Sequence, residues 1–286
     1  MISDRILPAV RSRLEERKLR VPLAELEARG ASRPSVGGSR ASFAAALRGP
    51  HVALIAEVKR ASPSAGLIRP HLQVEKVVCN YAGAGAKAIS VLTEEDHFLG
   101  SLADLATATA TTELPVLRKD FIIDEYQVYE AWAYGASAIL LIAALLTDSQ
   151  LRRLIQLAGS LGLDVLLEVH DRGELERALS FEGVVIGINN RDLRTFHVSL
   201  DTTLDLARLV PPELVLVAES GIRNRSDLEC LARCGVDAVL VGEALLRGED
   251  EAGKVRELVQ PPLAVRPRNA ERRRREAGGP AGENGD

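Results

Sequence analysis

Short apolar runs rich in β-branched residues alternate with longer amphipathic segments between residues 52 and 257. Near-continuous apolar runs are typical of parallel strands that are buried on both faces and covered by helices. A helix-like stretch follows each run, as after the seventh, where the helical pattern stops at Gly235. The pattern predicts eight strands, at residues 52–59, 87–93, 115–120, 137–143, 164–170, 183–189, 214–220 and 238–242.

Eight strand–helix repeats within about 205 residues favour a closed (β/α)8 TIM barrel over an open doubly wound sheet. Before the barrel, apolar stripes at helical spacing predict a helical extension. We therefore expect an N-terminal helical arm at residues 1–50 and the catalytic barrel at residues 51–257. The Arg- and Gly-rich segment 258–286 has little apolar surface to bury, so we expect a disordered tail there.

Composition narrows the class of protein. The longest apolar run, residues 138–146, is shorter than the ~20 residues that a membrane span needs. Charged residues interrupt the N-terminus where a signal peptide would lie, so we expect a cytoplasmic protein without a membrane partner. A net charge of −4 and an aromatic content of 3% argue against nucleic-acid binding. The three cysteines form neither a disulfide framework nor a metal-ligand set.

Polar residues interrupt the predicted strands close to their carboxyl ends, where TIM barrels carry their active sites. A structural ring of ion pairs is the alternative interpretation, but buried ion pairs are poor stabilisers compared with apolar packing. Opposite charges at this end of a barrel more often tune catalytic acids and bases. The residues concerned are Glu57, Lys59, Lys119, Glu168, His170, Asn189, Glu219 and Ser220.

The loops after the seventh and eighth strands predict a phosphate site. Gly221 and Gly242 stand where main-chain N–H groups of such barrels approach an anion. Ser62 and Ser64, after the first strand, add hydroxyl donors. Because Glu243 brings a carboxylate to this end, we expect its side chain to turn away and the main chain to bind the anion.

Five segments resemble the signature blocks of the indole-3-glycerol-phosphate synthase family, in the family's order. The resemblance implies a carbon–carbon lyase of tryptophan biosynthesis that needs no cofactor and no metal. Its small-molecule phosphorylated substrate would be 1-(2-carboxyphenylamino)-1-deoxyribulose 5-phosphate, which is decarboxylated, cyclised and dehydrated to indole-3-glycerol phosphate. The segments are residues 55–66, 117–124, 166–171, 186–193 and 218–222.

The resemblance also implies roles for the matched residues. Lys119 would protonate the substrate carbonyl, and Lys59 would bind the substrate carboxylate until it leaves. Glu57 and Glu168 would supply the acid and base for loss of water, with pKa shifts of unknown direction. His170 would support these groups rather than react. Asn189 and Ser220 would complete the catalytic set, and Arg191 would orient the polar groups of the substrate. Phe98, Phe121 and Leu140 would form an apolar wall, unless these three only pack in the core. The phosphate loops add the predicted binding residues Glu219, Gly221, Gly242 and Glu243.

Two other functions stay open. Another phosphosugar barrel enzyme, such as an isomerase or a Schiff-base aldolase with Lys119 or Lys59 as nucleophile, would use the same phosphate loops. A paralogue that binds a phosphorylated metabolite without turning it over is the other alternative. For any of the three we expect a monomer or a weak homo-oligomer.

Overall fold

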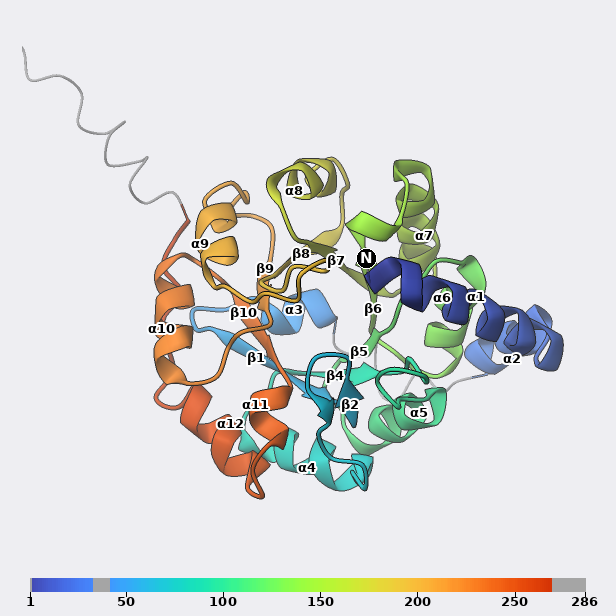
Figure 1. Ribbon diagram of the computed structural model, residues 1–286, viewed down its shortest axis with the longest axis horizontal. Helices are drawn as coiled ribbons and strands as arrows, with labels where there is room; N and C mark the ends of the chain where they lie inside the picture. The colour runs from blue at the N-terminus through green and yellow to red at the C-terminus, as the bar shows by residue number, and fades with distance from the viewer. Residues whose placement is uncertain (1, 33–41, 269–286) are drawn as a thin grey trace, which may run out of the picture.

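The computed structural model describes residues 2–32 and 42–268, and its centre is a closed barrel of eight parallel strands (Figure 1). The strands neighbour one another in the order β1-β10-β9-β8-β7-β6-β5-β4, so the predicted (β/α)8 TIM barrel is confirmed. Every predicted strand is present, with ends that differ by at most two residues. The strands are β1 (Ala53–Val58), β4 (Ala88–Leu92), β5 (Val116–Lys119), β6 (Ala138–Ile142), β7 (Asp164–Val169), β8 (Val184–Asn189), β9 (Leu216–Glu219) and β10 (Ala238–Val241).

Helices surround the barrel (Figure 1) and bury its outer face. Several of them begin at a residue whose side chain accepts a main-chain N–H of the first turn, as Asp171 does from Glu174 at 2.9 Å. None of the described helices is long and apolar enough to cross a membrane. A 3-10 turn, η1 (Ala143–Leu145), follows β6, and the short strands β2 (Ala61–Ser62) and β3 (Gly66–Leu67) form a hairpin after β1. The helices are α4 (Val74–Ala84), α5 (Leu102–Thr111), α6 (Glu125–Ala133), α7 (Asp148–Ser160), α8 (Arg172–Ala178), α9 (Asp201–Ala207), α10 (Arg225–Arg233), α11 (Glu243–Leu246) and α12 (Glu251–Val259).

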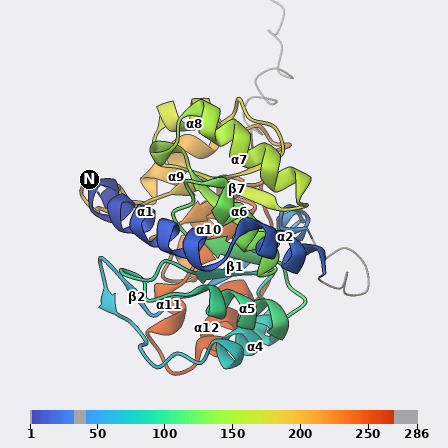
Figure 2. The ribbon, with the colours of Figure 1, turned by 90° about the vertical axis from the view of Figure 1, so that its right-hand side faces the viewer.

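The N-terminal arm touches both ends of the barrel. Helix α3 (Phe43–Leu47) closes the amino end, where the main-chain N–H of Ala44 donates to Asp164 at 3.0 Å. Helix α1 (Ile2–Arg20), which precedes α2 (Leu23–Ala31), reaches the carboxyl end, and Figure 2 shows its first residues on the same side as β2. Arg17 of α1 pairs with the buried Glu130 of α6 at 2.9 Å. The arm is therefore bound to the barrel rather than loosely attached.

The chain after the barrel is structured further than expected. Helix α12 crosses the boundary predicted at residue 257, and the following segment returns to the amino end of the barrel, where Val265 donates to Pro50 O at 2.9 Å. Arg268 is buried there and donates to Asp237 Oδ2 at 2.8 Å. The expectation of disorder is thus wrong for residues 258–268, because Arg268 finds a carboxylate and main-chain carbonyls to satisfy it. The rest of the predicted tail lies outside the described residues.

The packing of α2 against α6 depends on one glycine. A Cβ added at Gly30 would lie 2.1 Å from Cε3 of Trp132, which is closer than atoms can approach. We predict that Gly30→Ala destabilises the protein by ~1–3 kcal/mol because the indole must move. The midpoint of urea unfolding measures the change.

Gly159, within α7, provides the matched control, because a Cβ there would meet nothing within 4 Å. Gly159→Ala should stabilise the helix by up to ~1 kcal/mol through its better helix propensity. Equal effects of the two substitutions would contradict the packing that we assign to Gly30.

Candidate active site

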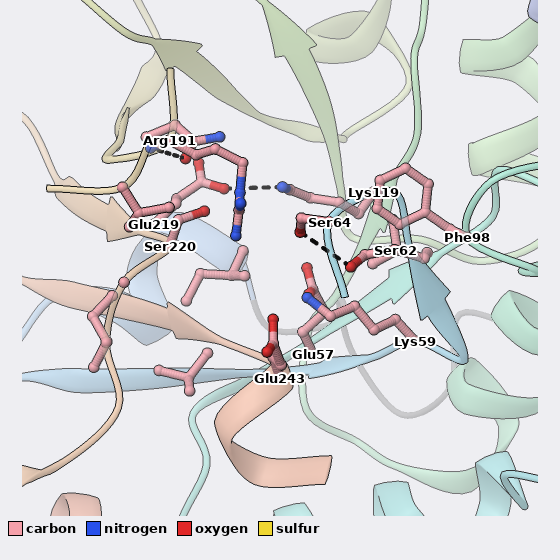
Figure 3. Close-up of a pocket in the computed structure, with 18 of the residues that line it drawn as sticks. Glu57, Lys59, Ser62, Ser64, Phe98, Lys119, Arg191, Glu219, Ser220 and Glu243 are labelled. Carbon is pink, nitrogen blue, oxygen red and sulfur yellow. Dashed lines mark hydrogen bonds and ion pairs between the residues drawn. The ribbon is translucent and has the colours of Figure 1, made fainter. Parts of the chain in front are cut away.

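A cavity of about 680 Å³ opens at the carboxyl ends of the barrel strands (Figure 3). Every residue that the sequence assigned to catalysis or substrate binding lines this cavity. The structure brings them together from strands and loops that are far apart in the chain. The cavity also has lining residues that were not among the predicted site residues, namely Pro63, Leu92, Asp120, Ile142, Leu193, Phe196, Val198, Ile222, Arg223, Leu240, Val241, Ala244, Arg247 and Lys254.

Strand periodicity explains why the charged residues face inward. Side chains two residues apart lie on one face of a strand. Leu117 of β5 and Leu166 of β7 belong to the apolar cluster inside the barrel, so Lys119 and Glu168 continue the same inward rows one step closer to the mouth. Apolar residues therefore fill the barrel interior and polar residues its carboxyl end.

Lys119 lies between two carboxyl groups from other strands. Its Nζ is 3.0 Å from Oε2 of Glu219 on β9 and 3.5 Å from Oε2 of Glu168 on β7. Burial by itself lowers the pKa of this lysine, but the charges of Glu219, Glu168 and Glu57 together outweigh burial and raise it. The amine is therefore held as an ammonium group that can donate a proton.

The two carboxyl groups around Lys119 have different environments. Burial raises the pKa of Glu168, but Lys119, a contact with His170 at 3.1 Å and a hydrogen bond from Asn189 outweigh it and lower the pKa to about 2. Apart from its contact with Lys119, Glu219 has no hydrogen-bond partner among the described residues. Burial and the repulsion of Glu168 and Glu57 raise the pKa of Glu219 to about 7, although Lys119 opposes the shift. Of the two carboxyl groups, Glu219 is therefore the one that takes up a proton more readily.

A second lysine–carboxylate pair lies beside the first. Lys59 Nζ is 2.8 Å from Glu57 Oε1, and both side chains are largely buried. Figure 3 shows this pair facing Lys119 across the cavity, next to Glu243. The site thus holds two separate ammonium groups, each beside at least one carboxyl group.

Two glycines provide the space that these carboxyl groups occupy. A Cβ at Gly242 would lie 2.4 Å from Oε1 of Glu57, and a Cβ at Gly187 of β8 would lie 2.5 Å from Oε1 of Glu219. The sequence singled out Gly242 only for the approach of an anion. It missed Gly187, whose one signal was a glycine inside an otherwise apolar strand.

The loop after β9 presents main-chain groups to the cavity. Ser220 and Gly221 have φ of +64° and +82°, so both adopt the left-handed conformation. Asn190 holds this turn, because its Nδ2 donates to the carbonyls of Glu219 and Ser220 at 3.0 Å each. Within residues 2–32 and 42–268, the N–H groups of Gly221 and Ile222 have no acceptor. They are free to bind an anion.

The opposite loop, after β10, differs from the expectation in one respect. The side chain of Glu243 does not turn away; it lines the cavity and accepts a hydrogen bond from Arg247 Nε at 2.9 Å. Arg247 follows α11 directly, four residues after Glu243, and its guanidinium offsets the charge of this carboxylate. Arg191, Arg223 and Lys254 add further positive charge to the lining of the cavity.

An apolar wall covers the other side of the cavity. The rings of Phe98 and Phe121 lie 6.3 Å apart between centroids, and the buried Leu140 of β6 lies below them. The loop that carries Phe98 folds around Glu94, whose Oε2 accepts the main-chain N–H groups of His97 at 2.7 Å and Phe98 at 3.0 Å. Figure 3 shows Phe98 and Ser220 on opposite sides, so the cavity has an aromatic end and an anion end.

The first loop completes the site. Ser62 Oγ accepts from the N–H of Ala65 at 3.1 Å and lies 3.4 Å from Ser64 Oγ, and both hydroxyls line the cavity. In the part of the chain that the structure describes, no three His, Cys, Asp or Glu side chains are grouped as metal ligands.

Comparisons with known proteins agree on one family. The model of the family described as "Indole-3-glycerol phosphate synthase" matches residues 3–258. An indole-3-glycerol phosphate synthase of Dehalococcoides mccartyi is 50% identical over 262 residues, which cover 91% of this chain and 100% of that protein. One of Burkholderia ambifaria is 47% identical over 251 residues, covering 87% of this chain and 95% of that protein.

Solved structures of lower identity share the fold. The 3-hexulose-6-phosphate synthase of Salmonella typhimurium has a TM-score of 0.59 at 13% identity, covering 72% of this chain and 96% of its own. The thiamine phosphate pyrophosphorylase of Pyrococcus furiosus has a TM-score of 0.56 at 18% identity, covering 74% and 95%. At these identities the likeness shows the barrel alone.

The raised pKa of Glu219 predicts a pH-dependent stability change in Glu219→Gln. The pKa of this carboxyl group rises on folding from 4.5 to about 7, so the folded protein favours its protonated form. Its contribution to stability is therefore fully present below pH 4.5 and is lost as the pH rises through 7. Glutamine does not ionise. Relative to wild type, the variant should therefore become more stable between pH 4.5 and pH 8, by up to about 3 kcal/mol.

Thermal unfolding midpoints across this pH range measure the difference. Glu75→Gln, on the exposed face of α4, is the matched control and should give a small, nearly constant difference. A Glu219→Gln difference that is equally constant with pH would show that Glu219 ionises normally.

Proposed function

The chain belongs to the indole-3-glycerol phosphate synthase family, and on this premise we propose that it is a carboxy-lyase converting 1-(2-carboxyphenylamino)-1-deoxyribulose 5-phosphate to indole-3-glycerol phosphate, carbon dioxide and water. The observation that carries the proposal is the position of Lys119, within 3.5 Å of both Glu168 and Glu219, in a cavity with an aromatic end and an anion end. The reaction needs an acid, a base and two anion-binding groups, and this cavity offers each of them.

Ring closure is the first step. The aromatic carbon that bears the carboxylate attacks the ketone carbon, and the ketone oxygen must gain a proton as its double bond opens. Lys119 is the group suited to donate it, because the surrounding carboxyl groups keep its amine protonated. Phe98 and Phe121 would hold the anthranilate ring against the apolar wall.

Decarboxylation follows from the same intermediate. The carbon–carbon bond to the carboxylate breaks, carbon dioxide leaves, and the bonding electrons restore the aromatic ring. Until then the substrate carboxylate needs a cation, and Lys59 lies across the cavity from Lys119 for this purpose. Glu57, 2.8 Å from Lys59, keeps that ammonium in place.

Dehydration requires a base and an acid. A proton leaves the methylene carbon and the hydroxyl group leaves as water, which forms the indole double bond. Glu168, whose lowered pKa keeps it ionised, is available to accept this proton, and Glu57 is another carboxyl group that lines the cavity. Ring closure, decarboxylation and dehydration together consume one more proton than they release, because the substrate carboxylate leaves as neutral carbon dioxide. Glu219, 3.0 Å from Lys119 and with a pKa of about 7, is suited to return a proton to the lysine.

The substrate phosphate would bind at the other end of the cavity. Gly221 and Ile222, whose N–H groups have no acceptor among the described residues, line the cavity together with Arg191, Arg247 and Ser220. Asn189 and the serine hydroxyls of the first loop are then available to the substrate's hydroxyl groups. Because every residue invoked comes from one chain, a monomer or weak homo-oligomer suffices for this site.

The aldolase alternative receives less support. A Schiff-base lysine must lose its proton to act as a nucleophile, which requires a lowered pKa. Lys119 has the opposite shift, because it is surrounded by carboxyl groups. A binding protein without activity would not need the unequal pair of Glu168 and Glu219, so we favour the lyase.

The direct test is to add the carboxyphenylamino-deoxyribulose phosphate to the purified protein and follow indole fluorescence. We predict product formation without added metal or cofactor. Substrate binding by the folded protein without any product would favour the non-catalytic alternative, and trapping of substrate on the protein by borohydride would favour the aldolase.

Lys119→Met tests the assignment of the acid. We predict a fall in kcat of at least about 100-fold, because general acid catalysis contributes factors of this order. Lys87→Met is the matched control, since Lys87 is exposed at the opposite end of the barrel, before β4, and should leave kcat unchanged. Near-full activity of Lys119→Met would reject this role of Lys119 but not the reaction.

A further inference from the structure

His170 lies behind Glu168, at the edge of the site. It follows β7 directly and precedes α8, and its side chain is only 10% exposed. His170 is not one of the described residues that line the cavity, so its side chain is not in a position to touch substrate. The proposed reaction assigns it no step.

Both ring nitrogens of His170 face carboxyl groups. Nδ1 lies 3.0 Å from Glu174 Oε2, and Nε2 lies 3.1 Å from Glu168 Oε1, where the geometry is that of an ion pair rather than an aligned hydrogen bond. Glu174 is itself fixed, because Oε2 also accepts the main-chain N–H of His170 at 2.8 Å. The imidazole therefore bridges the catalytic carboxyl group and the first turn of α8.

This bridge requires a protonated ring. A neutral imidazole has one N–H and one lone pair, so one of its nitrogens would point a lone pair at a carboxylate oxygen. An imidazolium carries an N–H group on both nitrogens, so each carboxylate faces a positively charged ring rather than a lone pair. Burial lowers the pKa of His170, but Glu168 and Glu174 outweigh burial and raise it to about 10, which agrees with the geometry.

The charged ring distinguishes Glu168 from Glu219. Glu168 faces two cations, His170 and Lys119, and a hydrogen-bond donor, Asn189 of β8. Glu219 of β9 has Lys119 but no second ion-pair cation among the described residues, and the charge of Glu57 on β1 also raises its pKa. Without the imidazolium, Glu168 would lose one of the two cations that favour its ionised form.

We propose that His170, held by Glu174, is a positioning residue that keeps Glu168 ionised and so directs the proton of the Lys119 cluster to Glu219. The proposal rests on the proposed lyase function, because it explains why Glu168 is available as the base of the dehydration. The role is electrostatic: the imidazolium acts on the reaction only through Glu168.

The first test measures the charge of His170 without reference to activity. NMR titration of the imidazole groups follows the five histidines of the chain, and the spectrum of His170→Gln identifies the signal of His170. We expect that signal to remain protonated at pH 8, and to titrate at lower pH in Glu174→Gln, where the second carboxylate is gone. Titration of His170 near 6.5 in the wild-type protein would overturn the proposal, whatever the protein catalyses.

The second test is the pH profile of kcat from pH 5.5 to 9. In His170→Gln the pKa of Glu168 should rise, so the loss of kcat relative to wild type should be at least about threefold greater at pH 5.5 than at pH 8.5. In Glu174→Gln the ring loses its proton more easily, so the loss should instead be greater at high pH. The KM should change little in either variant, because neither residue lines the cavity.

Glu176→Gln is the control, since Glu176 is an exposed carboxylate of α8 that pairs with Arg172 at 2.8 Å. It should leave the profile unchanged. A loss of kcat that is the same at every pH in both test variants would indicate a purely structural role for His170 and overturn the proposal. Failure of the wild-type protein to form indole product would instead reject the proposed function, and the NMR titration would still decide the charge of His170.

Discussion

The burial of an ammonium group between two carboxyl groups is the constraint on which the rest of the structure depends. Glu168 and Glu219 are almost completely buried and Lys119 is largely buried, so water does little to stabilise their charges. Removing charges from water costs free energy that is recovered only when the partners are held at short distance. Placing the three residues at the ends of three strands of a closed barrel meets this requirement, because the backbone hydrogen bonds of the barrel fix the strands.

Much of the surrounding structure maintains this cluster. Gly187 leaves space for Glu219, and His170 gives Glu168 a second cation. On the outer face of β5, next to Lys119, the fully buried Arg118 pairs with Asp120 at 2.9 Å and with Glu130 at 3.1 Å. Glu130 in turn pairs with Arg17 of the N-terminal arm. The N-terminal arm thus helps to fix the end of β5, which carries Lys119. A change in the packing of the arm would therefore alter the position of Lys119 in the cavity.

The strand pattern was sufficient to predict the barrel and the residues that meet at its mouth. Polar residues such as Lys119 and Glu168 ended otherwise apolar runs, and parallel strands bring their carboxyl ends together, so convergence followed from periodicity. The sequence could not predict which carboxyl group holds the proton, because this depends on distances to Lys119 and His170 across strands. It also failed at Arg268, whose carbonyl and carboxylate partners come from other parts of the chain.

The central claim is that two buried carboxyl groups beside one lysine hold different charges, and infrared spectroscopy of the carboxyl stretch tests it most directly. At pH 5.5 the wild-type protein should show a band of a buried protonated carboxyl group that disappears as the pH rises through about 7. The band should be absent from Glu219→Gln and present in Glu168→Gln. A wild-type band that is lost in Glu168→Gln and kept in Glu219→Gln would contradict the account, because the proton would then reside on the carboxyl group assigned as the base.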